Sequence, residues 1–362
     1  MGRRDVQRAD PLAAPRPACP RPSQRSGRGR RLRYFGSKAS VVGDVLREVS
    51  ASVPSGSICD PFGGIGVIGA AFKEAGYSVY SGDHLVFPYL YQAARLGLSR
   101  PPAFQGLSRH LRLHSASEVA AHLNGVGGHA GWITSQYSRE RAFFSLENAM
   151  LIDGCRAAIE EWASSRWITR TERGFLIASL IDSADRVANT AGTYYAYLKT
   201  LTRRAAHRFV FTLLVPVPGR SAQISLGDAL TLVGRRRYEV VYLDPPYNER
   251  RYGGYYHLPE SIARGTTPAV SGRAGVPVEP WPSSSFNHPR EATEALRRLI
   301  EAADCRLLAV HYARDGIVAT AEIEGMLSAW GNLKTVELTA LGYTSRPEKR
   351  AKRHMLYLAQ HA

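Results

Sequence analysis

The sequence lacks the features of a disulfide-linked, a membrane-spanning or a metal-binding protein. Four of its 362 residues are cysteine, and no two have the close spacing that zinc sites use. No cluster of His, Asp and Glu has convincing metal spacing either, so we expect no metal and a reducing compartment. No apolar run reaches the roughly 18 residues of a spanning helix, and no apolar segment follows the basic start. We therefore expect a cytoplasmic protein without a membrane partner.

Acidic residues are also scarce. The 31 Asp and Glu face 47 Lys and Arg, which gives a formal charge of +16 and favours a polyanionic partner. Residues 1–33 hold ten Arg and two Asp, so half of the excess lies there. Five prolines in this stretch would break the amphipathic helix of a transit peptide. We therefore expect a disordered basic arm over residues 1–32.

Apolar periodicity indicates an α/β fold from residue 33 onward. Residues 38–49 have a helical pattern, and a strand over 57–60 leads through a glycine-rich turn and a helix over 67–75 to a second strand over 77–81. This βαβ unit predicts a parallel sheet. Further elements are expected at strands 222–226, 239–243 and 306–310 and at helix 291–303. The sheet is therefore built from residues 33–99 and 222–362.

The segment between these two parts lacks strong strand signals. Residues 137–162 and 172–204 carry apolar positions at helical spacing, so residues 100–221 are expected to form a largely helical insertion. Residues 265–290 hold five Pro and three Gly. We expect no regular element there, but a functional or mobile loop.

The first motif is the turn Asp60-Pro-Phe-Gly-Gly-Ile-Gly66, which joins a strand to a helix. Glycines such as Gly64 and Gly66 allow the backbone to approach a ligand, and Asp83, at the tip of the next strand, can accept both hydroxyls of a ribose. Phe62 and its preceding proline replace the spacing that wraps a pyrophosphate, which favours a nucleoside without phosphates. S-adenosylmethionine fits, because Asp60 would favour its sulfonium cation. A tight turn without a ligand is the alternative.

The second motif, Asp244-Pro245-Pro246-Tyr247, ends a buried strand at the edge where open α/β sheets bind ligands. Two prolines fix the backbone, so the Asp244 and Pro245 carbonyls can be held in a cleft. Hydrogen bonds from an exocyclic aromatic amine to the Asp244 carboxylate and the Pro245 carbonyl would free its lone pair for attack on a methyl group. Tyr247 offers a flat face to a base removed from its duplex.

These two motifs, in this order, resemble those of the alpha-class (Dam-like) N6-adenine DNA methyltransferases from about residue 31 onward. The segment Tyr34-Phe-Gly-Ser-Lys38 is similar to that family's first cofactor motif. The resemblance implies that Tyr34 contacts the adenosyl group, that Lys38 lies near the methionine end and that Asp83 binds the ribose. It also implies that Asp228 lies beside the cofactor adenine. The insertion would then be the target-recognition domain.

The family's fold is a Rossmann-like seven-stranded sheet with a reversed last strand, which residues 354–359 could supply. The implied activity is S-adenosylmethionine-dependent, site-specific methylation of adenine N6 in double-stranded DNA after base flipping. Residues 248–252 and 256–260 resemble a restriction-modification subset, so a cognate restriction endonuclease is a possible partner. Two alternatives stay open: methylation of N4-cytosine or RNA adenine, and a catalytically silent fold that acts as a DNA-binding module.

Several other residues have both a functional and a structural interpretation. Arg250 and Arg251 follow the catalytic motif and could hold DNA phosphates, or they could be solvated surface charges. A core-packing helix explains the tyrosine cluster better than base stacking, and a polar helix face suffices for the nearby acidic group. His257 is expected to be structural, and His311 and Tyr312, where the subset commonly has Ser-Tyr-Asn, receive no role. The tyrosine cluster comprises Tyr194, Tyr195, Tyr197 and Lys199, and the acidic group comprises Asp182, Asp185 and Asn189.

Overall fold

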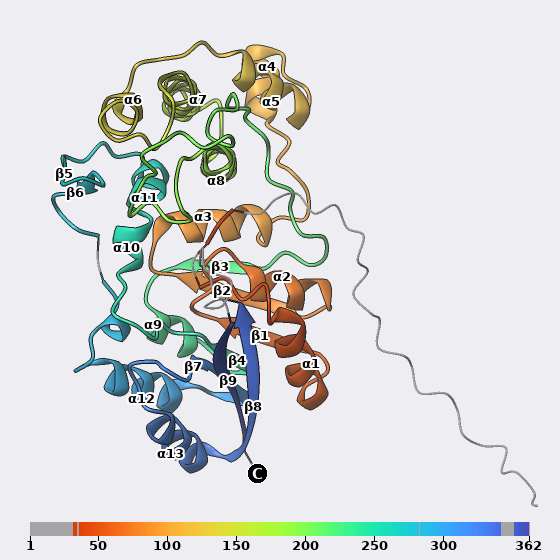
Figure 1. Cartoon of the computed structure of the whole chain (residues 1–362). Coiled ribbons are helices and arrows are strands. Elements are labelled where there is room, and N and C mark those ends of the chain that lie inside the picture. Colours follow the sequence, from red (N-terminus) through yellow and green to blue (C-terminus); the bar gives the residue numbers. More distant parts are fainter. Residues whose placement is uncertain (1–31, 35, 282, 342–350, 362) are drawn as a thin grey trace, which may run out of the picture. The chain divides into compact units, whose positions relative to one another are not determined.

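A seven-stranded sheet forms the centre of the chain in a computed structural model that describes residues 32–34, 36–281, 283–341 and 351–361 (Figure 1). The predicted basic arm over 1–32 falls almost entirely outside the described residues. The strand order is β3-β2-β1-β4-β7-β9-β8. The strands are β1 Ser57–Asp60, β2 Ser78–Asp83, β3 Gln223–Leu226, β4 Tyr238–Leu243, β7 Cys305–Ala313, β8 Asn332–Leu341 and β9 Ala351–Gln360.

Five strands run parallel, and β9 reverses the direction. It pairs antiparallel with β7, so that His311 faces Leu356, and antiparallel with β8 along its whole length. The reversed strand predicted at residues 354–359 is therefore confirmed. The edge strand β8 was not predicted; few of its described side chains are fully buried, although its polar and apolar residues alternate as in a half-buried strand.

Helices cover both faces of the sheet. On one face, α1 (Val42–Ser52) and α2 (Val67–Glu74) bury apolar side chains against β1, β4 and β7. On the other face, α9 (Ala229–Val233), α12 (Ala292–Ala302) and α13 (Thr320–Trp330) bury theirs against the same strands. Both faces are therefore dry, as a parallel sheet requires, and ligand chemistry is left to the strand ends.

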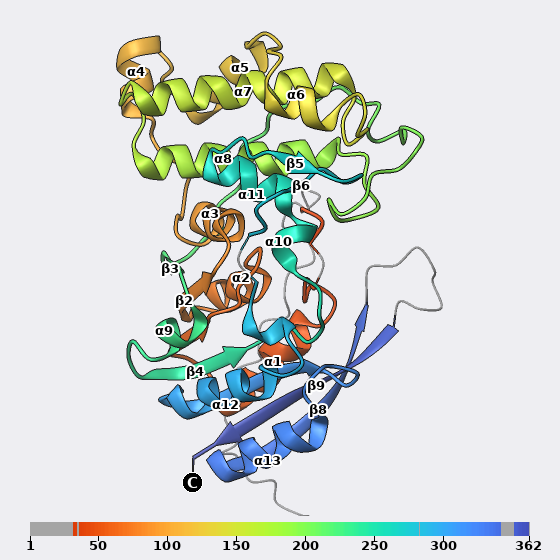
Figure 2. The same cartoon turned by 90° about the vertical axis from the view of Figure 1, so that its left-hand side faces the viewer.

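Helix α3 (Val86–Arg95) joins the sheet to the insertion. It lies between β2 and β3 on one side and the long helix α8 on the other (Figures 1 and 2). The insertion is helical, as predicted, and shares one apolar core with α3 and with α11 (His257–Arg264), so residues 32–362 form a single compact unit. Its helices are α4 Gln105–Leu111, α5 Ala116–Gly125, α6 Trp132–Tyr137, α7 Leu146–Ser164 and α8 Arg170–Arg186.

Three predicted boundaries were wrong. The helix expected over 172–204 ends at Arg186, and the tyrosine-rich stretch that follows is a loop. The helix expected over 137–162 is two helices, because residues 138–145 leave the helical path. The stretch 265–290 holds a short hairpin, β5 (Val270–Ser271) with β6 (Val276–Pro277), and a 3-10 turn, η1 (Ser285–Asn287). Its breaker residues enable the hairpin, since Gly272 and Gly275 have φ near +68° and +65°.

The polar residues of α8 and its end do not face solvent as expected. Asp182, Asp185 and Asn189 are buried, and each side chain makes hydrogen bonds within the protein. Asp185 accepts hydrogen bonds from the backbone and guanidinium of Arg33 at 3.2–3.3 Å and lies 3.8 Å from the Arg204 guanidinium. Asn189 closes the loop after α8 by bonding residues 142, 198 and 202. These buried contacts fix the loop and the chain start against α8.

None of the helices in the described part of the chain combines the length and the apolar character needed to cross a membrane.

Asp185→Ala should lower the free energy of unfolding by about 3–5 kcal/mol, because it leaves two mostly buried guanidinium groups without their carboxylate. Urea denaturation followed by circular dichroism measures the change. Asp44→Ala is the matched control: it removes an exposed carboxylate 2.8 Å from Arg47 and should leave the midpoint unchanged. Equal midpoints for both variants would show that the Asp185 contacts contribute nothing to stability.

Candidate active site

Four acidic side chains stand in a row at the carboxyl edge of the sheet. Asp60 ends β1, Asp83 ends β2, Asp244 follows β4 and Asp228 follows β3, and these four strands are neighbours. All four residues line one cavity of about 530 Å³. The parallel arrangement therefore gathers carboxylates that are far apart in the sequence, at the edge where such sheets bind ligands.

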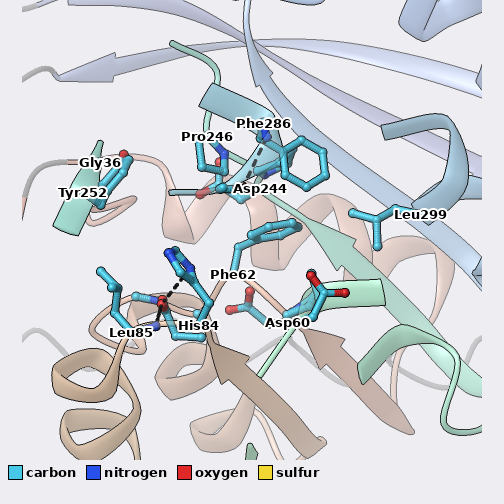
Figure 3. A pocket seen from close by; sticks show the side chains of 18 of the residues that line it. Gly36, Asp60, Phe62, His84, Leu85, Asp244, Pro246, Tyr252, Phe286 and Leu299 are labelled. Carbon is cyan, nitrogen blue, oxygen red and sulfur yellow. Dashed lines mark hydrogen bonds and ion pairs between the residues drawn. The ribbon is translucent and has the colours of Figure 1, made fainter. Parts of the chain in front are cut away.

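Most of the predicted site residues lie on the wall of this cavity. They are Tyr34, Lys38, Asp60, Phe62, Gly64, Asp83, Asp228, Asp244, Pro245, Pro246 and Tyr247. Gly66, Arg250 and Arg251 do not line it. The residues predicted for cofactor binding and those predicted for catalysis thus share a single space, part of which Figure 3 shows.

The glycine turn brings its backbone close to the cavity. Gly64 has φ +51°, and a Cβ there would lie 2.8 Å from the ring of Tyr34. Gly66 lies behind the wall: with φ +72° it precedes the first residue of α2, and a Cβ would lie 2.9 Å from Leu96. Gly64 therefore lets the ring of Tyr34 lie close to the turn, whereas Gly66 shapes the turn.

Two of the acids already hold backbone in place. Asp83 accepts hydrogen bonds from the amides of Gly64 at 3.2 Å and Leu85 at 3.0 Å. Burial raises its pKa, and the neighbouring His84 opposes this. Asp228 is exposed and caps α9 through the amide of Leu230 at 2.9 Å. Each keeps free lone pairs at the cavity, so these bonds do not conflict with the predicted ribose and adenine contacts.

Lys38 forms an ion pair with Asp244 that the sequence did not reveal. Its Nζ lies 2.6 Å from Asp244 Oδ2 and donates to the carbonyl of Gly36 at 3.1 Å. Burial raises the pKa of Asp244 to about 6, against the opposing effect of Lys38. Burial would lower the pKa of Lys38, but the charge of Asp244 raises it overall. The pair is therefore ionised at neutral pH.

Asp60 is the least satisfied group in the cavity wall. It is 2% exposed, and its Oδ1 has no hydrogen-bond partner among the residues that the structure describes. Burial, followed by the charge of Asp244, raises its pKa to about 8. Asp244 Oδ1 is likewise buried without a partner. Two carboxylate oxygens in one cavity thus await donors, which is the state expected of a binding site rather than a structural core.

Tyr247 packs against two other rings beside the cavity. The ring of His354 lies at 5.3 Å and that of Tyr312 at 6.1 Å, both nearly perpendicular. His354 Nδ1 lies 3.1 Å from His311 Nε2, and His311 Nδ1 lies 2.8 Å from the Tyr242 hydroxyl. His311 and Tyr312, which had no assigned role, are therefore buried residues that support the turn predicted to be catalytic.

Several lining residues were missed by sequence reasoning. Tyr252 belongs to a segment noted for its resemblance, but no role was given to it. Phe286 comes from the stretch 265–290, and its ring lies 5.3 Å from that of Phe62 at 88° (Figure 3). Ser284 and Arg298 also line the cavity. The suggestion that this stretch is functional was the available signal, but nothing local indicated which of its residues face the site.

The remaining candidates lie outside the cavity. Arg250 and Arg251 are exposed and follow the catalytic turn directly. Tyr194 is buried, whereas Tyr195 is 57% exposed and stacks on Tyr255 at 5.0 Å. His257 is fully buried, with Nε2 2.9 Å from the Tyr194 carbonyl, in agreement with a structural histidine.

A seven-stranded sheet with a reversed strand, an acid-lined cavity and a glycine turn define a Rossmann-like methyltransferase, which confirms the predicted fold class. Residues 34–317 match the family model described as D12 class N6 adenine-specific DNA methyltransferase. The chain belongs to this family, and the resemblance seen in the sequence is confirmed.

Curated relatives are restriction-modification methyltransferases. The chain is 29% identical over 332 residues to Type II methyltransferase M.FokI of Planomicrobium okeanokoites, a match that covers 88% of the chain and 50% of that relative. It is 28% identical over 315 residues to M.NlaIII of Neisseria lactamica, covering 84% and 90%. The chain thus spans about half the length of M.FokI.

Among solved structures, the chain is similar to magnesium protoporphyrin IX methyltransferase from Synechocystis PCC 6803 with bound SAM. The TM-score is 0.31 at 12% identity, covering 89% of this chain and 79% of that one. This likeness is too distant to bear on substrate or site.

Asp60→Asn should stabilise the protein, increasingly so as pH rises from about 4 to about 8. The folded-state pKa of about 8 lies above the ordinary value of 3.8, so folding at intermediate pH requires proton uptake or a buried charge. The difference should grow by at most about 1.4 kcal/mol per pH unit and then level off. Urea midpoints of both proteins at pH 5 and pH 8 measure it. A gap that narrows towards pH 8 would contradict this origin.

Proposed function

We propose that the protein methylates the N6 amine of adenine in double-stranded DNA, with S-adenosylmethionine as methyl donor. The observation that carries the proposal is Asp244 Oδ1, a buried acceptor without a partner, beside Pro245 and Tyr247. It shares a cavity with the acids of the glycine turn and the second strand. Family membership agrees with this chemistry.

The wall residues suit the cofactor. Asp60 offers a partnerless carboxylate oxygen to the cofactor's cationic end, and the charge of such a ligand would lower the raised pKa of Asp60. Asp83 would accept the ribose hydroxyls, with Asp228 and Phe62 at the adenine and Tyr34 on the adenosyl group. Gly64, which has no side chain, would leave room for the cofactor beside the turn. When bound, S-adenosylmethionine supplies a methyl group on a positively charged sulfur.

The catalytic turn would activate the amine. Its two protons would be donated to Asp244 Oδ1 and to the Pro245 carbonyl, which draws the nitrogen out of conjugation with the ring. Lys38 holds the other oxygen of the same carboxylate at 2.6 Å, so the acceptor cannot rotate freely. Tyr247, whose ring is nearly perpendicular to that of His354, would stack on the flipped base. The nitrogen gains a methyl group and loses one proton, for which the Asp244 carboxylate is the acceptor within hydrogen-bond reach.

DNA binding would involve the insertion and the loop after the catalytic turn. The insertion over 100–221 would act as the target-recognition domain, and the exposed Arg250 and Arg251 would hold phosphates next to the target base. The folded part keeps a net positive charge, which suits a polyanion. A cognate restriction endonuclease and a cytoplasmic location complete the proposal.

The test is incubation of the purified protein with tritiated S-adenosylmethionine and mixed-sequence duplex DNA. Label should appear in DNA, and nuclease digestion with mass spectrometry should identify N6-methyladenine. Product at N4-cytosine, or label confined to RNA or protein, would overturn the substrate assignment. Absence of transfer to any of these would favour a silent fold that only binds DNA.

Asp244→Ala should abolish methyl transfer, by at least about 10³-fold in kcat, because it removes the acceptor aimed at the amine. Cofactor binding, measured by isothermal titration with S-adenosylhomocysteine, should remain detectable, since the cofactor wall is intact. Asp228→Ala should show the reverse pattern, with weaker cofactor binding and a smaller effect on kcat. A fully active Asp244 variant would remove the proposed mechanism.

The rate should rise with pH through about 6 and then level off, because Asp244 acts as a carboxylate and is protonated below its pKa. In Lys38→Met the midpoint should move to higher pH, since Lys38 opposes the upward shift caused by burial. Single-turnover rates between pH 5 and 9 measure both profiles. Lys73→Met is the control, because Lys73 is also buried but bonds the carbonyls of Leu96 and Leu98 outside the cavity. A midpoint that Lys38→Met leaves unchanged would show that Asp244 does not set the profile.

A further inference from the structure

A short segment, residues 283–287, contacts both the glycine turn and the loop that follows Tyr247. We call this segment the strap. Its residues 283–286 line the same space as the glycine turn. Phe286 is 7% exposed and packs its ring edge-on against Phe62 of that turn at 5.3 Å. The strap therefore borders the part of the cavity that contains the cofactor turn.

The next residue of the strap, Asn287, holds the loop that follows the catalytic motif. Asn287 is 5% exposed, and its Nδ2 donates to the carbonyl of Asn248 at 2.8 Å and to that of Arg250 at 3.0 Å. Asn248 closes the same turn from within, since its Oδ1 accepts from the amide of Arg250 at 3.1 Å. Residues 248–251 belong to no helix or strand. Asn248 and Asn287 thus help to hold residues 248–250, and the Arg251 carbonyl accepts from the amides of Gly254 and Tyr255.

The turn that contains Phe286 and Asn287 is fixed by its own hydrogen bonds. Ser284 accepts from the amide of Phe286, and the amide of Asn287 donates to the Ser284 carbonyl at 3.0 Å, which closes the turn η1. Phe286 and Asn287 are therefore adjacent residues of one turn, with their side chains bound to different motifs. A change in how Phe286 packs would change where the Asn287 amide points.

We infer that Asn287 is a positioning residue through which an occupied cofactor site orders residues 248–251 for DNA. This inference rests on the proposed function, because it takes the cavity as the site of S-adenosylmethionine and the loop as a DNA contact. Phe286 and Asn287 already make these contacts, so a ligand packed against the strap stabilises this arrangement further over others in which Asn287 releases the two carbonyls, and Arg250 and Arg251 are then presented in one conformation more of the time. Cofactor and DNA therefore bind with positive coupling, and the factor is the same in both directions.

Asn287→Asp tests this with little change in shape. The carboxylate lacks the two donors and faces the carbonyls of Asn248 and Arg250 with its own oxygens. The probes are S-adenosylhomocysteine and a duplex that the wild type methylates. DNA affinity is measured by fluorescence anisotropy with and without S-adenosylhomocysteine, and S-adenosylhomocysteine affinity by titration without DNA.

In the wild type, S-adenosylhomocysteine should tighten DNA binding by about tenfold, within the usual range for coupled sites. In Asn287→Asp this factor should approach one, the KM for DNA should rise by a similar factor, and S-adenosylhomocysteine affinity without DNA should stay within about twofold. Asn287→Ala should behave in the same way and serves if the Asp variant does not fold. Asn124→Asp is the matched control: its amide also donates to two carbonyls, of Ala120 and Phe211 at 2.8 and 2.9 Å, so the coupling factor should be unchanged.

The possible outcomes separate this inference from the proposed function. A wild type that neither binds S-adenosylhomocysteine nor methylates DNA contradicts the proposed function itself. A wild type that methylates DNA, together with Asn287 variants that keep the full coupling factor, overturns the role of Asn287. So does a uniform loss of both binary affinities with a lower melting temperature, because that is the signature of a merely structural residue.

Discussion

The burial of several carboxylates at one sheet edge is the constraint on which the site depends. Asp60, Asp83 and Asp244 are raised in pKa first of all by burial, and the charge of Asp244 raises the pKa of Asp60 further. Such an arrangement opposes folding, and carboxylates with raised pKa values cluster at functional sites. A positively charged ligand relieves the repulsion, and whatever binds the folded state alone also stabilises it. Under the proposed function, the raised pKa values of these carboxylates would favour a cationic ligand in this cavity.

Lys38 decides which of these acids acts as an acceptor at neutral pH. Its ammonium is bonded to Asp244 and not to Asp60, so Asp244, with a pKa near 6, is ionised while Asp60, with a pKa near 8, is mostly protonated until a cation arrives. Two similar carboxylates thus receive different tasks from their surroundings. The segment that carries Lys38 is itself held by Tyr34, which stacks on Tyr256 at 5.0 Å.

The sequence predicted those parts of the site whose residues are close neighbours in the chain. The strand β1, its glycine turn and the Asp244-Pro-Pro-Tyr247 turn appear as expected, because each combines a buried strand with residues that fix the backbone. The ion pair between Lys38 and Asp244 was not foreseeable, since the two residues are far apart in the sequence and only the tertiary structure brings them together. The stretch after Arg186 was predicted as a helix because its apolar and aromatic residues have helical spacing, whereas Asn189 closes it as a loop through tertiary hydrogen bonds.

Burial and the charge of Lys38 also determine the pKa values of His311 and His354, which support the turn of residues 244–247. Burial, then the charge of Lys38, lowers the pKa of His354 to about 4 and that of His311 well below its usual value. Both rings are thus neutral, so they hydrogen-bond to each other and to Tyr242 without adding charge next to the ion pair. A protonated histidine at this place would compete with Lys38 for Asp244. Because both histidines are neutral, side chains of β7 and β9 can pack against Tyr247 without adding positive charge near Asp244. Lys38 therefore remains the cation that pairs with Asp244.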